Sequence, residues 1–118
     1  MVTPQPVPVV SAADVHRVVN RDFPVERRDE VHQCLAEYVS TSGSAARVHL
    51  AVLKLSAGDL ASLRSWLQVA RVDFRDVLAP AEYPEYFRRL RGDNSMSLSG
   101  LEEVVASDWR QYCSWLER

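Results

Sequence analysis

The sequence contains one lysine, Lys54, four glycines and two cysteines. The small number of glycines favours helices, and the charge balance and the cysteines each argue against a class of protein. Its positive charges are almost all arginine, interspersed with acidic residues, and the formal net charge is -2. Proteins that bind duplex DNA usually have a strongly positive net charge, because neutralisation of the phosphates dominates their affinity. The composition therefore argues against that class, although it leaves room for a local basic patch. Cys34 and Cys113 are too few and too far apart for a disulfide scaffold, so we expect reduced, partly buried thiols.

Long apolar runs and the signatures of common catalytic sites are also missing. No segment has the unbroken apolar length of a membrane span, and the first residues lack the pattern of a secretory signal. We expect a cytoplasmic protein without a membrane partner. There is no phosphate-binding loop, dinucleotide-binding glycine motif or serine nucleophile elbow. We therefore expect no cofactor, no catalytic residue and a protein that is not an enzyme. An enzyme or metal-binding protein without a recognisable motif is kept as an alternative.

What is present is typical of one globular domain. The 118 residues are 47% hydrophobic and 25% charged, which suffices for a single buried core. Residues 1–10 carry Pro4, Pro6 and Pro8, which remove backbone donors and favour extended chain. We interpret residues 1–10 as a proline-rich N-terminal arm that is frayed or loosely packed. A ligand for an aromatic groove and an arm that docks on a second copy are the alternatives. Residues 11–118 are predicted to form a single helical domain.

Apolar residues after position 10 recur at helical spacing, and capping residues divide them into six segments. Ser11 with Asp14 and Ser99 with Glu102 have the spacing of capping boxes. Pro84 suits the first turn of a short helix. The six predicted helices begin at or after Ser11, Pro24, Ser44, Asp59, Tyr83 and Ser99, and the first five end at or near Phe23, Gly43, Gly58, Pro80 and Gly92.

The stretch from residue 44 to residue 79 predicts the centre of the fold. Between residues 45 and 55 the apolar side chains nearly encircle the helix axis, and Arg47 and Lys54 share one narrow polar strip. A helix that is apolar almost all round is one that other helices surround. The short connection at Gly58 turns the next helix back beside it, with one continuous buried seam running to Val77. We predict an all-α fold, a compact bundle of about five or six helices around a central antiparallel helix pair.

Part of this stretch resembles small uncharacterised bacterial proteins. The shared pattern is LKLS.G....L......A..D.RDVL..AEYP, which this chain matches between Leu53 and Pro84, about a third of its length. That group has no established activity. The resemblance implies a bacterial origin and helical structure, and it transfers no site residue.

A charged cluster surrounds the predicted end of the fourth helix. It could be a paired-carboxylate acid/base site, an acidic docking surface or a structural ion-pair network, and we favour the network. The residues concerned are Asp73, Arg75, Asp76, Glu82 and Glu85.

The three histidines fall in three different predicted helices. They are His16, His32 and His49, and no two of them form a local metal-binding pair. We therefore expect no metal site.

Aromatic residues at helix edges form the candidate interaction surface. Such residues are enriched in interfaces, and Trp115 is expected at an exposed edge of the last helix. We predict a small non-enzymatic protein–protein interaction or regulatory helical domain that binds an unknown protein partner or self-associates. The alternative is a nucleic-acid-binding module in which the segment from Tyr83 to Arg91 stacks bases and neutralises phosphates. The candidate surface comprises Trp66, Tyr83, Tyr86, Arg88, Arg89, Arg91 and Trp115.

Overall fold

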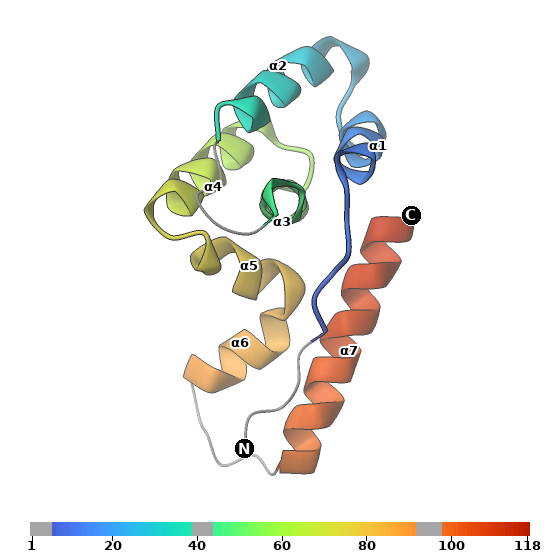
Figure 1. The fold of residues 1–118 in the computed structure, drawn as a ribbon, viewed down its shortest axis with the longest axis vertical. Coiled ribbons are helices and arrows are strands. Elements are labelled where there is room, and N and C mark those ends of the chain that lie inside the picture. The colour runs from blue at the N-terminus through green and yellow to red at the C-terminus, as the bar shows by residue number, and fades with distance from the viewer. Residues whose placement is uncertain (1–5, 39–43, 92–97) are drawn as a thin grey trace.

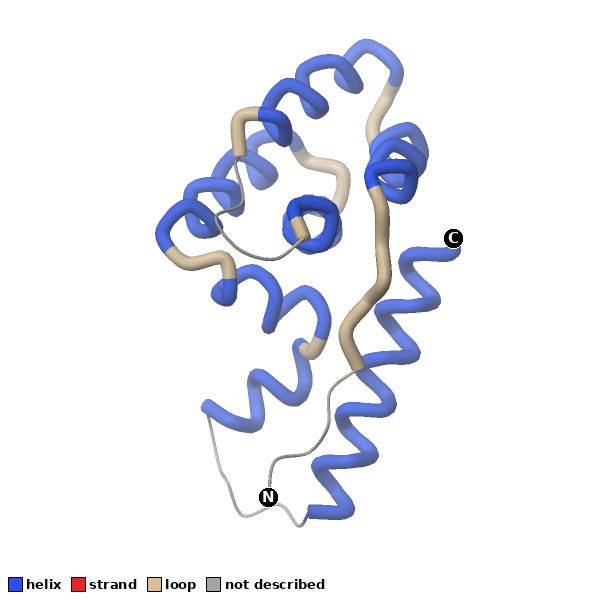
Figure 2. The backbone as a smooth tube through the Cα atoms, viewed as in Figure 1, coloured by secondary structure: helices blue, strands red, loops and turns tan. Residues whose placement is uncertain are grey.

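The computed structural model describes residues 6–38, 44–91 and 98–118, and within these ranges every regular element is an α-helix (Figure 2). The all-α prediction is confirmed, as a compact molecule of about 47 × 29 × 22 Å. None of the described helices is both long and apolar enough to span a bilayer. The helices are α1 (Ala12–Asp22), α2 (Val25–Ala36), α3 (Ala45–Ser56), α4 (Leu60–Val72), α5 (Arg75–Glu82), α6 (Pro84–Arg91) and α7 (Leu98–Glu117).

Helix α3 is the central element, as its apolar circumference predicts. It packs against α1, α4 and α5, and Figure 1 shows it end-on among them. Leu50, Val52 and Leu53 are 0% exposed, so side chains on different faces of the helix are all covered. Apart from its first turn and the partly exposed His49, the helix meets solvent mainly along the strip that carries Arg47 and Lys54.

The turn between α3 and α4 forms the predicted hairpin. Ala57 and Gly58 both adopt left-handed backbone, with φ of 51° and 82°. A side chain at Gly58 would also place its Cβ 3.0 Å from the carbonyl oxygen of Asp22, so glycine serves both the turn and the close approach of α1. The Asp59 carboxylate accepts the backbone N–H of Ser62 at 2.9 Å and caps α4.

Other helix starts also follow the local sequence. The backbone N–H of Ser11 donates to the Asp14 carboxylate at 3.0 Å, as a capping box requires. Ser44 Oγ accepts the backbone N–H of Arg47 at 3.3 Å. Pro24 stands directly before α2 in extended conformation. These contacts confirm the predicted starts of α1, α2 and α3.

The predicted fourth helix is wrong in one respect, because it is two helices. The chain leaves helical geometry at Asp73, whose φ and ψ are -156° and 110°. The Asp73 carboxylate accepts the backbone N–H of Arg75 at 3.0 Å, and this local bond competes with the helical ladder and starts α5. Pro80 therefore lies inside α5 rather than at a helix end. Val77 is buried in the same cluster as Leu63 and Leu67, as predicted, but it belongs to α5 and not to one continuous fourth helix.

The start of the last helix also differs from the prediction. Helix α7 already includes Leu98, so Ser99 lies within the helix and not at its N-cap. The predicted left-handed cap Gly43 and the loop glycine Gly92 lie outside the described residues.

Two apolar clusters hold the chain together. The main cluster joins α1 to α5 with the last turns of α7, whereas a smaller one joins α6 to the first half of α7 through Tyr83, Tyr86 and Val105. The described part of the arm, residues 6–10, contacts the rest of the structure at a few points, while Val7 and Val9 are 57% and 99% exposed. The Tyr83 hydroxyl donates to the carbonyl of Pro6 at 2.6 Å, and Pro8 is buried.

Candidate functional site

A pocket of about 410 Å³ opens where α3, α5 and α6 meet. Most of its wall is apolar or aromatic, and its charged groups come from α3 and α5. We refer to it as the α5–α6 pocket. Its lining residues are Arg47, Phe74, Arg75, Leu78, Ala79, Glu82, Tyr83, Tyr86 and Phe87.

The polar part of this pocket is a buried ion pair between α3 and α5. Arg47 donates through Nε and Nη2 to the two Glu82 carboxylate oxygens at 2.8 and 2.7 Å. The Glu82 side chain is only 3% exposed and that of Arg47 is 27% exposed. These bonds to Glu82 raise the pKa of Arg47, against the opposing effect of burial. A parallel two-bond pair of this kind fixes both side chains, so the pocket has a rigid charged edge.

Two tyrosines lie near this ion pair. Burial raises the pKa of Tyr83 to about 12, and its hydroxyl is committed to the Pro6 carbonyl. Burial also raises the pKa of Tyr112, which is 1% exposed. Among the described residues the Tyr112 hydroxyl has no hydrogen-bond partner. Both phenols therefore stay neutral near physiological pH and do not act there as bases.

The N-terminus of α6 is capped from α7. The Asp108 carboxylate accepts the backbone N–H of Tyr86 at 2.8 Å and of Glu85 at 3.3 Å. Asp108 is 4% exposed, and burial raises its pKa although these two bonds act in the opposite direction. This long-range cap orients the first turn of α6 and with it one wall of the pocket.

The charged cluster predicted around Pro80 resolves into separate ion pairs. Asp73 binds Arg75 at 2.8 Å, Glu82 binds Arg47, and Glu85 binds both Arg88 and Arg89. The ion-pair interpretation is confirmed for these carboxylates. These contacts do not favour the paired-carboxylate interpretation, since Asp73 and Glu82 each bind one arginine and Glu85 binds two.

The predicted interaction surface is not one surface. Tyr83 and Tyr86 are 4% and 8% exposed and line the α5–α6 pocket, whereas Trp66 is half-buried against the main cluster. The expected exposure of Trp115 is wrong, because its side chain is covered and the residue is 7% exposed. The Arg21 guanidinium lies 5.2 Å from its ring centroid and also donates to its carbonyl at 2.8 Å.

Arg88 and Arg89, the α6 arginines whose side chains are described, are both paired with an acidic residue. Arg88 and Arg89 share Glu85, which cancels part of their charge. Arg91 belongs to α6, but its side chain lies outside the described residues. The ion pairs weaken the nucleic-acid interpretation, because phosphate binding depends on uncompensated positive charge.

The three histidines do converge, although they come from three helices. His16, His32 and His49 line a pocket of about 350 Å³, and the first two stack with ring centroids 5.1 Å apart. In the part of the chain that is described, the buried Nε2 atoms of His32 and His49 have no hydrogen-bond partner. The same part contains no group of three or more side chains arranged to hold a metal ion.

Sequence reasoning missed Arg47, Asp108 and Tyr112 as members of this region. Arg47 was assigned to a polar strip, and its partner Glu82 lies 35 residues away. Asp108 is a single acidic residue on a long helix, with no local signal that it reaches α6. Tyr112 is buried in α7, and no spacing along the sequence indicates that it lies near Arg47 and Glu82.

Searches against protein-family models, curated proteins and solved structures return no match. The resemblance to small bacterial proteins therefore stays a prediction.

Proposed function

We propose that this chain is a small non-enzymatic interaction domain whose α5–α6 pocket receives an apolar side chain of a protein partner. The observation that carries the proposal is the composition of the pocket. Phe74, Leu78 and Phe87 supply an apolar wall in a hollow of about 410 Å³ that is open to solvent. Concave apolar sites with a few fixed polar groups are typical binding sites.

The buried ion pair supports binding rather than acid/base catalysis. Arg47 and Glu82 neutralise each other through two short bonds, and Tyr83 is held neutral. A catalytic acid or base needs a proton affinity matched to its working pH, which this arrangement does not favour. What the pair offers instead is a fixed polar edge that orients a bound segment.

The pocket can be tested by filling it. Ala79 lines it from α5 and is half-buried, so Ala79→Arg places a long charged side chain in the hollow and leaves both residues of the ion pair unchanged. Ala61→Arg on the exposed face of α4 is the matched control. We expect Ala79→Arg to lose the partner that the wild-type protein binds in a quantitative two-component assay, or to lose concentration-dependent self-association in sedimentation. The control should keep both.

Equal binding and equal mass for the two variants would refute the pocket as the binding site. Trp115→Glu is unsuitable for this purpose, because Trp115 is buried and the substitution would unfold its surroundings. Cytoplasmic location and bacterial origin are sequence-based predictions that form part of the same proposal.

A further inference from the structure

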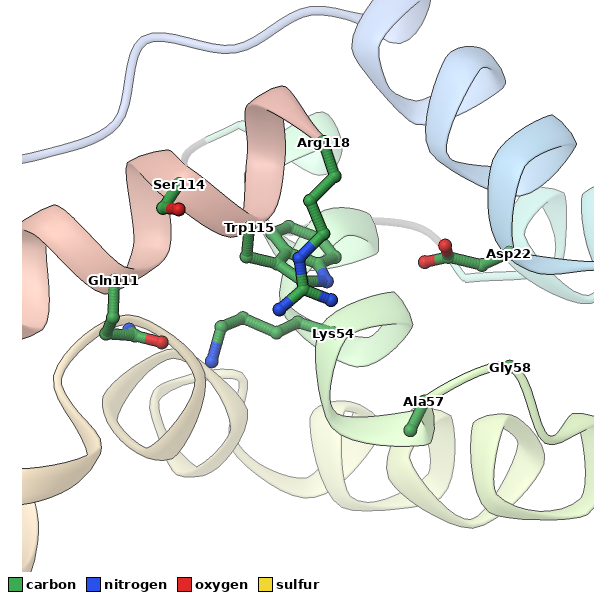
Figure 3. Close-up of a pocket in the computed structure, with 8 residues that line it drawn as sticks. All are labelled: Asp22, Lys54, Ala57, Gly58, Gln111, Ser114, Trp115 and Arg118. Carbon is green, nitrogen blue, oxygen red and sulfur yellow. The ribbon is translucent and has the colours of Figure 1, made fainter.

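A second pocket, of about 500 Å³, lies on a different side of the molecule, between α1, the end of α3 and the last turns of α7. Figure 3 shows its lining: Asp22, Lys54, Ala57, Gly58, Gln111, Ser114, Trp115 and Arg118. We refer to it as the Lys54 pocket. It shares no lining residue with the α5–α6 pocket.

The Lys54 pocket holds two cations. The side chains of Lys54 and Arg118 both extend into it, Lys54 from α3 and Arg118 from beyond α7 (Figure 3). Neither makes an ion pair or a side-chain hydrogen bond with any residue that the structure describes. Their mutual repulsion adds to the effect of burial, which lowers the pKa of Lys54.

The negative charges around this pocket are already engaged. Asp22 lines it, but both of its carboxylate oxygens accept from Arg21 at 2.8 and 3.1 Å. Asp108 does not line the pocket, but its charge raises the pKa of Lys54 more than Arg118 lowers it, while its carboxylate accepts two backbone N–H groups at the start of α6. Among the side chains that line the pocket, positive charge is in excess, since Asp22 is paired with Arg21 and Lys54 and Arg118 have no such partner among the described residues.

This excess is costly in the absence of a ligand. A half-buried ammonium without a partner loses hydration that nothing in the chain replaces. The single lysine lies on the central helix α3, whose only other basic side chains are Arg47, paired with Glu82, and His49. An anion bound between Lys54 and Arg118 would supply the missing partner to both cations at once.

We propose that the Lys54 pocket binds a small organic phosphate. Two positive charges match the charge of a phosphate monoester, and Lys54 offers a compact donor that suits phosphate oxygens. Ser114 and Gln111 add hydrogen-bonding side chains to the wall. The volume exceeds what inorganic phosphate needs and leaves space for an organic group beside Trp115 and Gly58. This inference does not rest on the α5–α6 pocket.

The test is a titration followed by amide NMR at constant ionic strength, with inorganic phosphate, adenosine monophosphate and adenosine as probes. We expect saturable shifts with one or both phosphates, confined to residues around positions 54–58 and 111–118, and none with adenosine. Lys54→Met should weaken phosphate binding about tenfold or more, because it removes a charge-assisted contact. Arg71→Met, which removes one exposed charge from α4, should leave the affinity unchanged.

Arg118→Gln provides a second variant, because Arg118 is exposed and its replacement does not disturb the fold. It should weaken phosphate binding in the same direction as Lys54→Met. The proposal is overturned if neither phosphate gives saturable shifts, if adenosine binds as well as its monophosphate, or if the Lys54 and Arg118 variants bind phosphate as tightly as the wild-type protein.

Discussion

The body formed by α1 to α5 and the end formed by α6 and the first half of α7 are built on different principles. The body is packed mainly by aliphatic side chains, with Leu50, Leu53 and Leu63 at 0% exposure, although Phe23 and Tyr38 are also buried in it. The other end relies on aromatic residues and polar bonds, chiefly Tyr83, Tyr86 and the Asp108 cap.

The two candidate sites lie where these regions meet. The α5–α6 pocket is lined from α3, α5 and α6, and the Lys54 pocket from α1, α3 and α7, so each lies between the body and one of the helices that follow it. The body also has an opening of its own, because the pocket lined by the three histidines lies between α1, α2 and α3.

The largest effect should come from opening a cavity in the body. Leu53→Ala should lower the free energy of unfolding by about 2–5 kcal/mol. Leu101→Ala makes the same chemical change in the smaller cluster, where Leu101 is only partly buried, and should cost about 1 kcal/mol or less. Urea denaturation measures both. Equal losses would mean that the two regions do not differ in packing.

The next effect concerns the ion pair at the junction. Arg47→Met leaves the Glu82 carboxylate buried without its partner and should lower the free energy of unfolding by about 3 kcal/mol. Arg75→Met breaks the exposed pair with Asp73 and should cost about 0.5 kcal/mol or less. In the double variant Arg47→Met, Glu82→Met most of the lost stability should return. A double variant as unstable as Arg47→Met would show that the ion pair is not the cause.

A smaller and local effect is expected from the cap of α6. Asp108→Ala removes the acceptor of two backbone N–H groups and should cost about 1 kcal/mol. Amide hydrogen exchange should accelerate in α6 while α3 keeps its protection. Ser107→Ala, at the exposed neighbouring position, is the control. Faster exchange throughout the body would contradict the separation of the two regions.

The smallest effect should come from His49 in the body. Burial lowers the pKa of His49, although the backbone carbonyls of Leu35 and Tyr38 oppose this. The folded state therefore favours the neutral imidazole, and its contribution is present above the ordinary value of 6.5 and decreases as the pH falls below it. The urea midpoint should decline on acidification toward about pH 5.5, and less steeply in His49→Gln. If the urea midpoint falls equally steeply with pH in the wild-type protein and in His49→Gln, His49 is not the cause of the acid destabilisation.

Local signals explain which parts of this fold are predictable from sequence. Ser11, Ser44 and Asp59 cap helices through bonds to backbone groups three residues away, so the spacing alone carries the information. Asp73 also acts through a local bond, because its carboxylate accepts the backbone N–H of Arg75 and ends the helical geometry there. The helical spacing of apolar residues continues past Asp73 to Val77, so the sequence pattern gives no sign of the break.

Partners distant in sequence account for the rest. The pairing of Arg47 with Glu82 and the capping of α6 by Asp108 depend on how whole helices pack. Trp115 was predicted to be exposed because its position on the helical wheel is peripheral, yet Arg21 of α1 and Tyr112 of α7 cover it. The spacing of apolar residues along one helix does not show which side chains another helix places against it.

Arg21 joins α1 to α7 across 94 residues through its bond to the Trp115 carbonyl. Closing so long a loop costs conformational entropy, and the contacts that offset this cost form only after the intervening helices have packed. Assembly of this protein should therefore begin with the hairpin of α3 and α4 and finish with the attachment of α7. During synthesis, α1 can pack on α2 and α3 before α7 is made, so only the bond from Arg21 to α7 and the Lys54 pocket have to form at that last step.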